Sequence, residues 1–291
     1  MAVRMYSTIL VPIDGSPGSE RAIDRALAFA RRFDATVHAL SVVETGGEPV
    51  ELDQERRDEL RRRAEKRSRQ ATAQVRDRAV DLDLEASRAV REGTPHRVVL
   101  EYAAAEDVDL IVMATRDRPD VRLGSTAERV IARADAPVVA VRPDEDGPAV
   151  DAISYDRVVV PTDGSDAAER AAERALDLAE AYGASVYVPY VVDTTSYDLE
   201  DTTRSMVGLL KEGGRNAVES IAEDASERGL SVKTDVLRGV PDEELVEYTE
   251  GVEADLVAMG TRGRGGATGD VLGSTTARVL RRTTRPVLTV R

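Results

Sequence analysis

Residues 255–274 read DLVAMGTRGRGGATGDVLGS, and this stretch decides the fold of the second half of the chain. It begins as a short apolar strand and ends at Gly273-Ser274, where a helix is expected to start. Five of the residues from Gly260 to Gly269 are glycine, so the backbone can adopt positive φ and turn its N–H groups toward a ligand. A strand, a glycine-rich loop and a helix N-terminus in this order predict a phosphate site. The alternative interpretation is a flexible surface loop.

The chain is a tandem duplication. Residues 7–14, STILVPID, align with residues 156–163, DRVVVPTD, at an offset of 149, and Gly-Ser follows both. Residues 109–113 and 255–259 align at an offset of 146. Repetition over whole strands at nearly constant spacing indicates a duplicated domain. The expected parts are a domain, a polar linker bracketed by prolines and a second domain: 1–142, 143–154 and 155–291.

Each copy alternates short β-branched runs with longer stretches of helical period, which indicates β-α-β units around a parallel sheet. The predicted strands are 7–13, 36–43, 84–91, 109–114 and 137–141, then 156–162, 185–192, 231–238, 255–260 and 286–290. The predicted helices are 17–33, 53–80, 95–105 and 125–133, then 166–182, 203–228, 241–250 and 274–283. We predict an α/β protein of two tandem doubly wound, Rossmann-like domains, each a five-stranded parallel sheet flanked by four helices. Ligands are expected at the carboxyl ends of the strands.

Composition argues against several classes of protein. Among the 291 residues there is no cysteine, so disulfides, thiolate chemistry and cysteine-type zinc sites are excluded. A net charge of −14 argues against nucleic-acid and anionic-membrane partners. The first apolar run is too short for a signal peptide and no window approaches a membrane span, so we expect a cytoplasmic protein. The acid excess and the scarcity of lysine, with three lysines among 40 basic residues, suggest a halophilic source. The alternative explanation for the few lysines is a GC-rich genome that encodes arginine.

Asp14 and Asp163 end the first strand of the two copies, in the motif Pro-x-Asp-Gly-Ser. At the carboxyl edge of a central strand, each carboxylate can accept hydrogen bonds from a ribose or an adenine, or help to hold a metal. The alternative is an aspartate that only turns the chain or caps the next helix. In the second copy, Ser274 and Thr275 follow Gly273 at the helix start, so N–H groups and the helix dipole can face anionic oxygens.

These residues resemble the universal stress protein family, whose ATP-binding members carry Gly-x2-Gly-x9-Gly-Ser/Thr after the fourth strand. Gly260, Gly263, Gly273 and Ser274 have this spacing, and the resemblance covers both copies. It implies the doubly wound fold, ATP with Mg²⁺ as cofactor, and dimerisation through the last strands. The residues that it implies at the nucleotide site are Pro161, Asp163, Val191, Met259, Gly260, Arg262, Gly263, Gly273, Ser274, Thr275 and Thr276.

The resemblance also implies roles for these positions. Asp163 holds the adenosine portion, and the backbone of Val191 reads the adenine edge. Gly260 and Gly263 line the ribose and phosphate path. The residues that bind the triphosphate are Gly273, Ser274, Thr275 and Thr276, with Arg262 and Arg264 contributing charge nearby.

The first copy departs from this motif. Ala114 stands where the second copy has Gly260, and Asp117 stands where it has Gly263. A methyl group and a carboxylate in a phosphate path oppose binding. Three arginines that can partly offset the carboxylate are Arg116, Arg118 and Arg122. We predict that the first copy binds ATP weakly or not at all, so that each chain holds one nucleotide.

Three functions stay open. The leading hypothesis is a stress-response protein that binds ATP in its second copy as a signal or stabiliser. The second is slow ATP hydrolysis or phosphoryl transfer, with Ser274 or Thr275 receiving phosphate; no catalytic residue and no protein metal site are assigned, and enzyme activity is the less favoured hypothesis. The third is a nucleotide-independent scaffold in which strands 137–141 and 286–290 pair within the chain, with a homodimer as a further option.

The two histidines, His38 and His96, do not suggest catalysis. His38 falls in the second predicted strand and His96 at the start of a predicted helix, so we expect a buried strand position and a surface helix end. The sequence also lacks a Gly-x4-Gly-Lys-Ser/Thr phosphate loop and the residues of an acyl-transfer triad.

Overall fold

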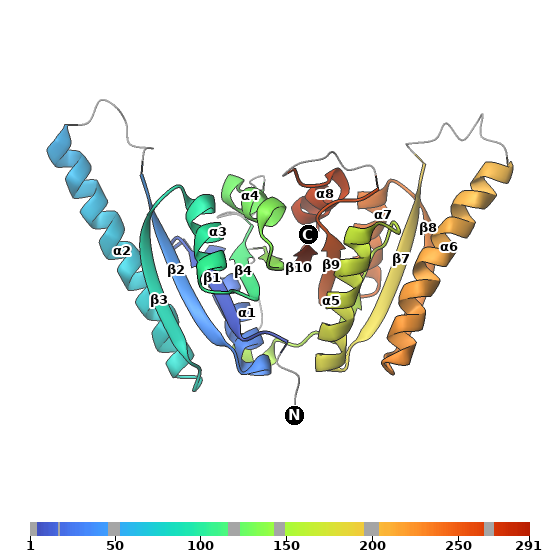
Figure 1. The fold of residues 1–291 in the computed structure, drawn as a ribbon, viewed down its shortest axis with the longest axis horizontal. Helices are drawn as coiled ribbons and strands as arrows, with labels where there is room; N and C mark the ends of the chain where they lie inside the picture. Colours follow the sequence, from blue (N-terminus) through green and yellow to red (C-terminus); the bar gives the residue numbers. More distant parts are fainter. Residues whose placement is uncertain are drawn as a thin grey trace. The chain divides into compact units, whose positions relative to one another are not determined.

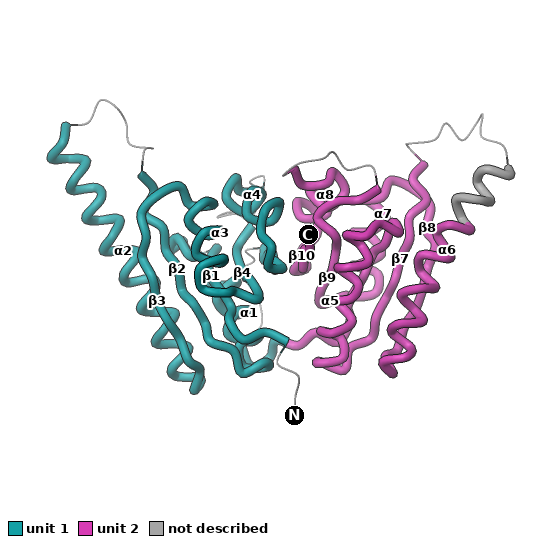
Figure 2. The backbone as a smooth tube through the Cα atoms, viewed as in Figure 1, with its two compact units in different colours: residues 1–153 teal, residues 154–291 magenta. Residues whose placement is uncertain are grey.

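The structure, a computed structural model, describes residues 5–16, 18–45, 53–115, 123–142, 149–194, 204–264 and 271–291, with the backbone alone for 204–211. The chain divides into two units, unit 1 (Met1–Ile153) and unit 2 (Ser154–Arg291), which Figure 2 shows in separate colours. No helix in the described part of the chain is long and apolar enough to cross a membrane.

Unit 1 follows the predicted alternation of strands and helices (Figure 1). Its elements are β1 (Thr8–Ile13), α1 (Gly18–Phe33), β2 (Thr36–Glu44), α2 (Gln54–Val80), β3 (Ala86–Gly93), α3 (Pro95–Ala105), β4 (Leu110–Ala114), α4 (Ser125–Arg133), β5 (Val138–Val141) and the 3₁₀ turn η1 (Val150–Ala152).

Unit 2 repeats the same order (Figure 1). Its elements are β6 (Arg157–Val159), α5 (Asp166–Tyr182), β7 (Ser185–Asp193), α6 (Arg204–Glu227), β8 (Val232–Gly239), α7 (Pro241–Gly251), β9 (Leu256–Gly260), α8 (Ser274–Arg282) and β10 (Val287–Val290).

The predicted fold class is confirmed in both units. The strand order is β3-β2-β1-β4-β5 in unit 1 and β8-β7-β6-β9-β10 in unit 2, and the pairs within each unit are parallel. The order reverses direction at β1 and at β6, the first strand of each unit. Right-handed crossovers to either side of that strand place the first two helices of each unit on one face of the sheet and the last two on the other. The crevice at the carboxyl end of that strand is where such folds bind ligands.

The central strands are continuous apolar runs because helices cover both faces. β4 begins Leu-Ile-Val-Met and β9 reads Leu-Val-Ala-Met-Gly, and these residues are buried. α5 lies against β9 with a stripe of buried small side chains, including Ala168, Ala171, Ala172 and Ala175. Small side chains let the helix approach the sheet closely, which decides what fits at the end of β9.

β6 is shorter than predicted, ending at Val159 instead of residue 162. Pro161 does not cause this, because the equivalent Pro12 lies inside β1. The difference lies in β7, where Pro189 has no N–H to donate to β6 and β2 has a leucine instead. The backbone nevertheless stays beside β7, because the N–H groups of Val160 and Thr162 donate to β7 carbonyl oxygens at 2.8 and 3.1 Å.

The segment between the two sheets is only partly loop. Residues 143–148 of the expected linker lie outside the described residues. η1 packs against α1, where Asp151 pairs with Arg31, so unit 1 extends to Ile153. Residues 149–153 of the expected linker therefore belong structurally to unit 1.

Candidate functional site

Asp163 is placed at the carboxyl end of β6 by a tight turn. Gly164 has a φ of +71°, and its N–H donates to Thr162 Oγ1 at 3.0 Å. One carboxylate oxygen of Asp163 accepts the Ser165 N–H at 3.1 Å, while Ser165 Oγ accepts the Ala168 N–H at 3.3 Å and caps α5. Asp163 therefore turns the chain, as in the alternative interpretation of the motif, but its second carboxylate oxygen reaches beyond the turn.

That second oxygen contacts the glycine-rich loop. The backbone N–H of Arg264 donates to Asp163 Oδ2 at 2.9 Å, and its guanidinium donates to the Gly164 carbonyl at 3.3 Å. A Cβ on Gly263 would collide with Asp163 Oδ2. Glycine at 263 thus lets the loop close on the carboxylate, and the structure brings together two residues that lie 100 positions apart in the sequence.

Gly260 is required by packing of α5. A Cβ on Gly260 would lie 2.7 Å from the backbone carbonyl carbon of Ala167 and 2.8 Å from its oxygen, closer than real Cβ atoms approach backbone. The equivalent residues in unit 1 are Ala114 on the strand and Gly18 on the helix. At this helix–strand position, unit 1 therefore has its alanine on the strand and unit 2 has its alanine on the helix.

This exchange gives a second explanation for Ala114. In unit 2 a Cβ at the equivalent position would point toward α5, and the matching helix residue of unit 1 is Gly18, so the alanine fits a helix contact as well as a blocked phosphate path. Asp117, Arg116, Arg118 and Arg122 lie outside the described residues.

The N-terminus of α8 has the features that the sequence predicted. Gly273 is the N-cap residue, and its own N–H donates to the Thr261 carbonyl at 2.8 Å. Within the described part of the chain, no acceptor is paired with the N–H groups of Ser274, Thr275 and Thr276, as expected for a first helical turn. Ser274 is exposed and Thr275 half-buried, so donors and hydroxyls are available at the positive end of the helix dipole.

Thr276 differs from its two neighbours. It is buried, and its hydroxyl donates to the Gly260 carbonyl at 2.8 Å. The side chain therefore fastens α8 to the end of β9. Its backbone N–H points toward the N-terminus of the helix, as those of Ser274 and Thr275 do.

Two residues at the start of the loop carry buried polar atoms without partners. Among the described residues, Thr261 Oγ1 and the Nε and Nη2 atoms of Arg262 have no hydrogen-bond partner. The equivalent hydroxyl in unit 1, on Thr115, donates to the Val141 carbonyl at 3.3 Å. A buried guanidinium donor without an acceptor is costly, so these atoms suit an anionic ligand. The sequence interpretation missed Thr261, although its match with Thr115 was a usable signal.

The other predicted site residues lie at the same edge of the sheet. Pro161 follows β6 and is buried, Met259 precedes Gly260 in β9, and Val191 lies near the end of β7 and is half-buried. β6 lies between β7 and β9 in the sheet. Because these strands are parallel, their carboxyl ends line one crevice.

α8 is held in place from the side of α7. Asp242 is buried and its two carboxylate oxygens accept from Arg278 at 3.3 Å and from Arg282 at 2.9 Å. A buried carboxylate with two guanidinium partners fixes the register of the two helices. It therefore positions the N-terminus of α8 over the crevice.

Unit 1 has His96 at the position of Asp242, and it corrects the expectation of a surface residue. His96 is buried, with 6% of its surface exposed. Burial and the charges of Arg129, Arg133 and Arg97 lower the pKa of His96. The sequence interpretation missed this because the helix packs its first turn against α4. His38, in contrast, is half-buried in β2, with Nδ1 3.1 Å from the Tyr102 hydroxyl.

We expect His96→Asp to change how the stability of unit 1 depends on pH. With a folded pKa below the ordinary value, His96 favours the native state only when neutral, so stability is lost as pH falls below about 6.5. Aspartate can instead pair with Arg129 and Arg133, as Asp242 pairs in unit 2. Urea unfolding at pH 7.5 and 5.5 should show a smaller loss of stability in the variant than in the wild type. An equal loss of stability between the two pH values in both proteins would contradict this. Any contribution of His38 to the pH dependence cancels, because both proteins contain it.

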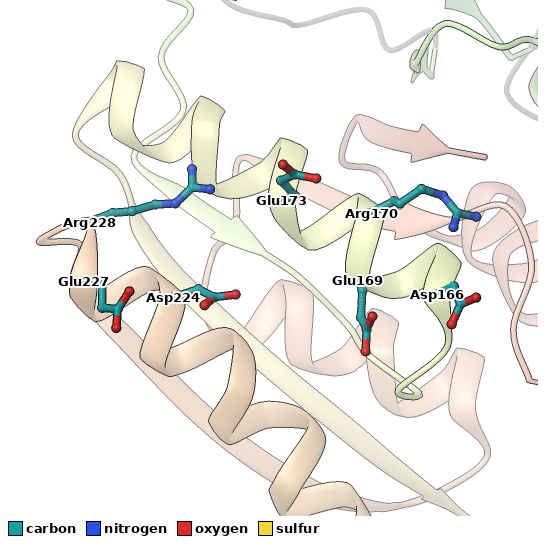
Figure 3. Close-up of a pocket in the computed structure, with 7 residues that line it drawn as sticks. All are labelled: Asp166, Glu169, Arg170, Glu173, Asp224, Glu227 and Arg228. Atoms are coloured by element: carbon teal, nitrogen blue, oxygen red, sulfur yellow. The ribbon is translucent and has the colours of Figure 1, made fainter.

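An open hollow with a volume of about 760 Å³ lies elsewhere in unit 2, between α5 and α6 (Figure 3). The residues that line it are Asp166, Glu169, Arg170, Glu173, Asp224, Glu227 and Arg228. Its two arginines bond elsewhere, Arg170 to the Arg291 carbonyl at 2.8 Å and Arg228 to Asp177 at 2.5 Å. The acidic lining repels a nucleotide, and none of the predicted site residues lies there. In the part of the chain that the structure describes, no group of three or more His, Asp or Glu side chains is arranged to hold a metal ion.

The geometry defines a duplicated doubly wound α/β protein whose second copy presents a glycine-rich loop and a helix N-terminus at the crevice. The chain belongs to the universal stress protein family, whose model matches residues 5–142 and 154–291.

Similar proteins agree with this family. Universal stress protein MJ0531 of Methanocaldococcus jannaschii is 39% identical over 140 residues, which are 47% of this chain and 82% of that protein. A universal stress protein of Mycolicibacterium smegmatis is 27% identical over 97% of this chain and 96% of its own length. The crystal structure of a universal stress protein from Archaeoglobus fulgidus matches with a TM-score of 0.73 at 22% identity, covering 99% of this chain and 98% of that one. The last match supports the fold of the whole tandem chain.

Proposed function

We propose that unit 2 binds ATP, with Mg²⁺, in the crevice at the carboxyl ends of β6, β7 and β9, and that occupancy serves as a signal or stabiliser in a stress response. The observation that carries this proposal is that two guanidinium atoms of the half-buried Arg262, Nε and Nη2, are buried and have no hydrogen-bond partner among the described residues. A phosphate group supplies the acceptors that this guanidinium requires. The resemblance of the loop to that of ATP-binding universal stress proteins selects adenine nucleotides among phosphate ligands.

The charges in the crevice suggest which end of the ligand lies where. The carboxylate of Asp163 repels phosphates and suits the hydroxyl or amino groups of a nucleoside, so the adenosine portion is placed beside β6 and the backbone of Val191. Arg262 and the N-terminus of α8 attract the triphosphate. Mg²⁺ prefers oxygen ligands and usually keeps phosphate and water oxygens, and the hydroxyls of Ser274 and Thr275 are the protein oxygens that fit it there.

We expect one nucleotide per chain. In unit 1, Asp14 Oδ1 accepts both the Ser16 N–H at 2.9 Å and the Ser19 hydroxyl at 2.7 Å. The second of these bonds has no counterpart in unit 2, where Ala168 stands in place of Ser19. Pairing of strands 137–141 with 286–290 within the chain, and association of two chains, are further proposals about the assembly.

ATP binding is tested by calorimetric titration and by thermal unfolding with and without Mg²⁺, in salt that keeps the protein folded. At 100 times the dissociation constant, ATP should stabilise unit 2 by about 2.7 kcal/mol, with a stoichiometry of one. cAMP, the ligand named for one solved universal stress protein, serves as the comparison nucleotide. Absence of both heat and stabilisation would leave the chain as a scaffold. A single-turnover assay with labelled ATP separates binding from slow hydrolysis.

A further inference from the structure

Two consecutive glycines, Gly213 and Gly214, interrupt α6 well inside its bounds. A glycine in a helix interior weakens the helix relative to alanine, and α2, the equivalent helix of unit 1, contains no glycine. Gly214 has a packing reason, because a Cβ there would lie 2.5 Å from Cδ1 and 2.8 Å from Cε1 of Tyr190. A Cβ on Gly213 would meet no atom within 4 Å in the described part of the chain, so packing does not explain this residue.

The two helices can be aligned through the turn that each of them covers. A Cβ on Gly15 would lie 3.8 Å from the Ala71 Cβ, and a Cβ on Gly164 would lie 3.4 Å from the Ala217 Cβ. These matching contacts set α2 and α6 in the same register at an offset of 146. One turn earlier, that register makes Gly213 the counterpart of Arg67.

Arg67 lies over the turn that follows Asp14. Its Cγ and Cδ atoms would be 3.6 and 3.7 Å from a Cβ on Gly15, so the stem of the side chain covers the carboxyl end of β1 from the helix side. In unit 1, the place beside the strand-one aspartate is therefore filled from α2.

In unit 2, the arginine that covers the equivalent turn, at Gly164, comes from the glycine-rich loop and not from α6. The guanidinium of Arg264, in the glycine-rich loop, lies against Gly164 and donates to its carbonyl at 3.3 Å. α6 contributes no side chain at position 213. The turn is therefore covered in both units, but in unit 2 the cover comes from the loop, and the exposed position 213 of α6, beside Gly214 and Tyr190, leaves open space.

We propose that Gly213 is the specificity-determining position of the nucleotide site: it keeps the α6 side of the crevice clear so that the nucleoside fits beside Asp163, and Arg67 closes the equivalent place in unit 1. This inference rests on the proposed function. It gives unit 1 a barrier to nucleotides that is independent of its loop.

The test is the substitution Gly213→Arg, which places the residue of unit 1 in unit 2, followed by titration with ATP. Affinity should fall at least tenfold although a positive charge is added near a polyphosphate. The melting temperature of the protein without nucleotide should stay level or rise, since arginine favours helices more than glycine does. Asn216→Arg adds the same charge at an exposed position of α6 and should keep affinity within twofold.

A second pair of variants excludes an indirect effect through Arg264. If Gly213→Arg acts only by displacing that side chain, then Arg264→Ala and the double variant should bind ATP equally, and the proposal is wrong. If it blocks the nucleoside, the double variant should bind at least tenfold more weakly than Arg264→Ala. Equal affinity of wild type and Gly213→Arg would overturn this inference alone, whereas a wild type that does not bind ATP removes the proposed function and this inference with it.

Discussion

Replacing Gly260 by alanine should destabilise unit 2 by about 2–3 kcal/mol, the range expected when a methyl group is forced into a packed contact. The added Cβ would lie 2.7 Å from the backbone carbonyl carbon of Ala167, and a helix backbone cannot yield as the end of a flexible side chain can. α5 must shift away from β9, which loosens the contact along the buried alanine stripe. Urea unfolding followed by circular dichroism measures the loss.

The second substitution Ala167→Gly should recover most of this stability. The double variant reproduces the arrangement of unit 1, where glycine is on the helix and alanine on the strand, so we expect a coupling free energy of about 1–2 kcal/mol in the double-mutant cycle. Ala114→Gly in unit 1 is the matched control, and it should cost no more than the loss of one methyl contact. Additive effects of the substitutions at positions 260 and 167 would show that Gly260 is not required by its contact with α5. ATP affinity of the double variant adds a second readout: if it stays at the wild-type value, Gly260 contributes packing and no ligand contact.

Gly263→Asp should weaken ATP binding by about 100-fold or more while changing the stability of the protein little. Position 263 is exposed, but its Cβ points at Asp163 Oδ2. A second carboxylate there adds like charge to steric conflict, so the loop cannot keep the 2.9 Å bond from the Arg264 N–H to Asp163. The expected loss corresponds to about 2.7 kcal/mol, at 1.36 kcal/mol for each factor of ten.

Two further variants serve as controls for Gly263→Asp. Gly263→Ala introduces the Cβ without the charge and meets only the end of the Asp163 side chain, so an intermediate loss is expected. Gly251→Asp adds a carboxylate at an exposed glycine where a Cβ meets no atom within 4 Å, and should leave the affinity unchanged. Undiminished ATP binding by Gly263→Asp would remove this loop from the nucleotide site and favour the scaffold hypothesis.

Most of the secondary structure could be predicted because periodicity and the repeat act locally. α3, α4 and α5 occupy their predicted bounds, and the other predicted elements lie within two residues of theirs apart from β6. The short turn η1 was not predicted. β6 ends early because Pro189 in the neighbouring strand β7 cannot donate a hydrogen bond to it, and the residues of β6 do not record what lies beside them. The duplication also allowed each copy to check the other.

The candidate site was predicted as a set of positions, but not as a set of contacts. Asp163, Gly263 and the start of α8 follow from motif spacing, and the structure brings the first two together. Arg264 and Thr261 acquire their importance from what surrounds them, the carboxylate of Asp163 in one case and the lack of a partner in the other. His96 was misassigned because the sequence shows that it begins a helix but does not show what packs over that turn.

By itself, the sequence determined that this chain is two copies of one doubly wound domain, and that residues 260–274 carry a glycine-rich loop between a strand and a helix. Both conclusions depend on order and spacing along the chain, which a sequence contains in full. Only the tertiary structure decided why individual residues are there, because a missing side chain has meaning only against its neighbours in space. A side chain at Gly260 would collide with Ala167, and one at Gly263 would collide with Asp163. Gly213 stands where the first unit has Arg67. Residues 255–274 therefore mark the candidate site, and the helices α5 and α6, which come earlier in the chain, contain the residues that give these glycines a structural meaning.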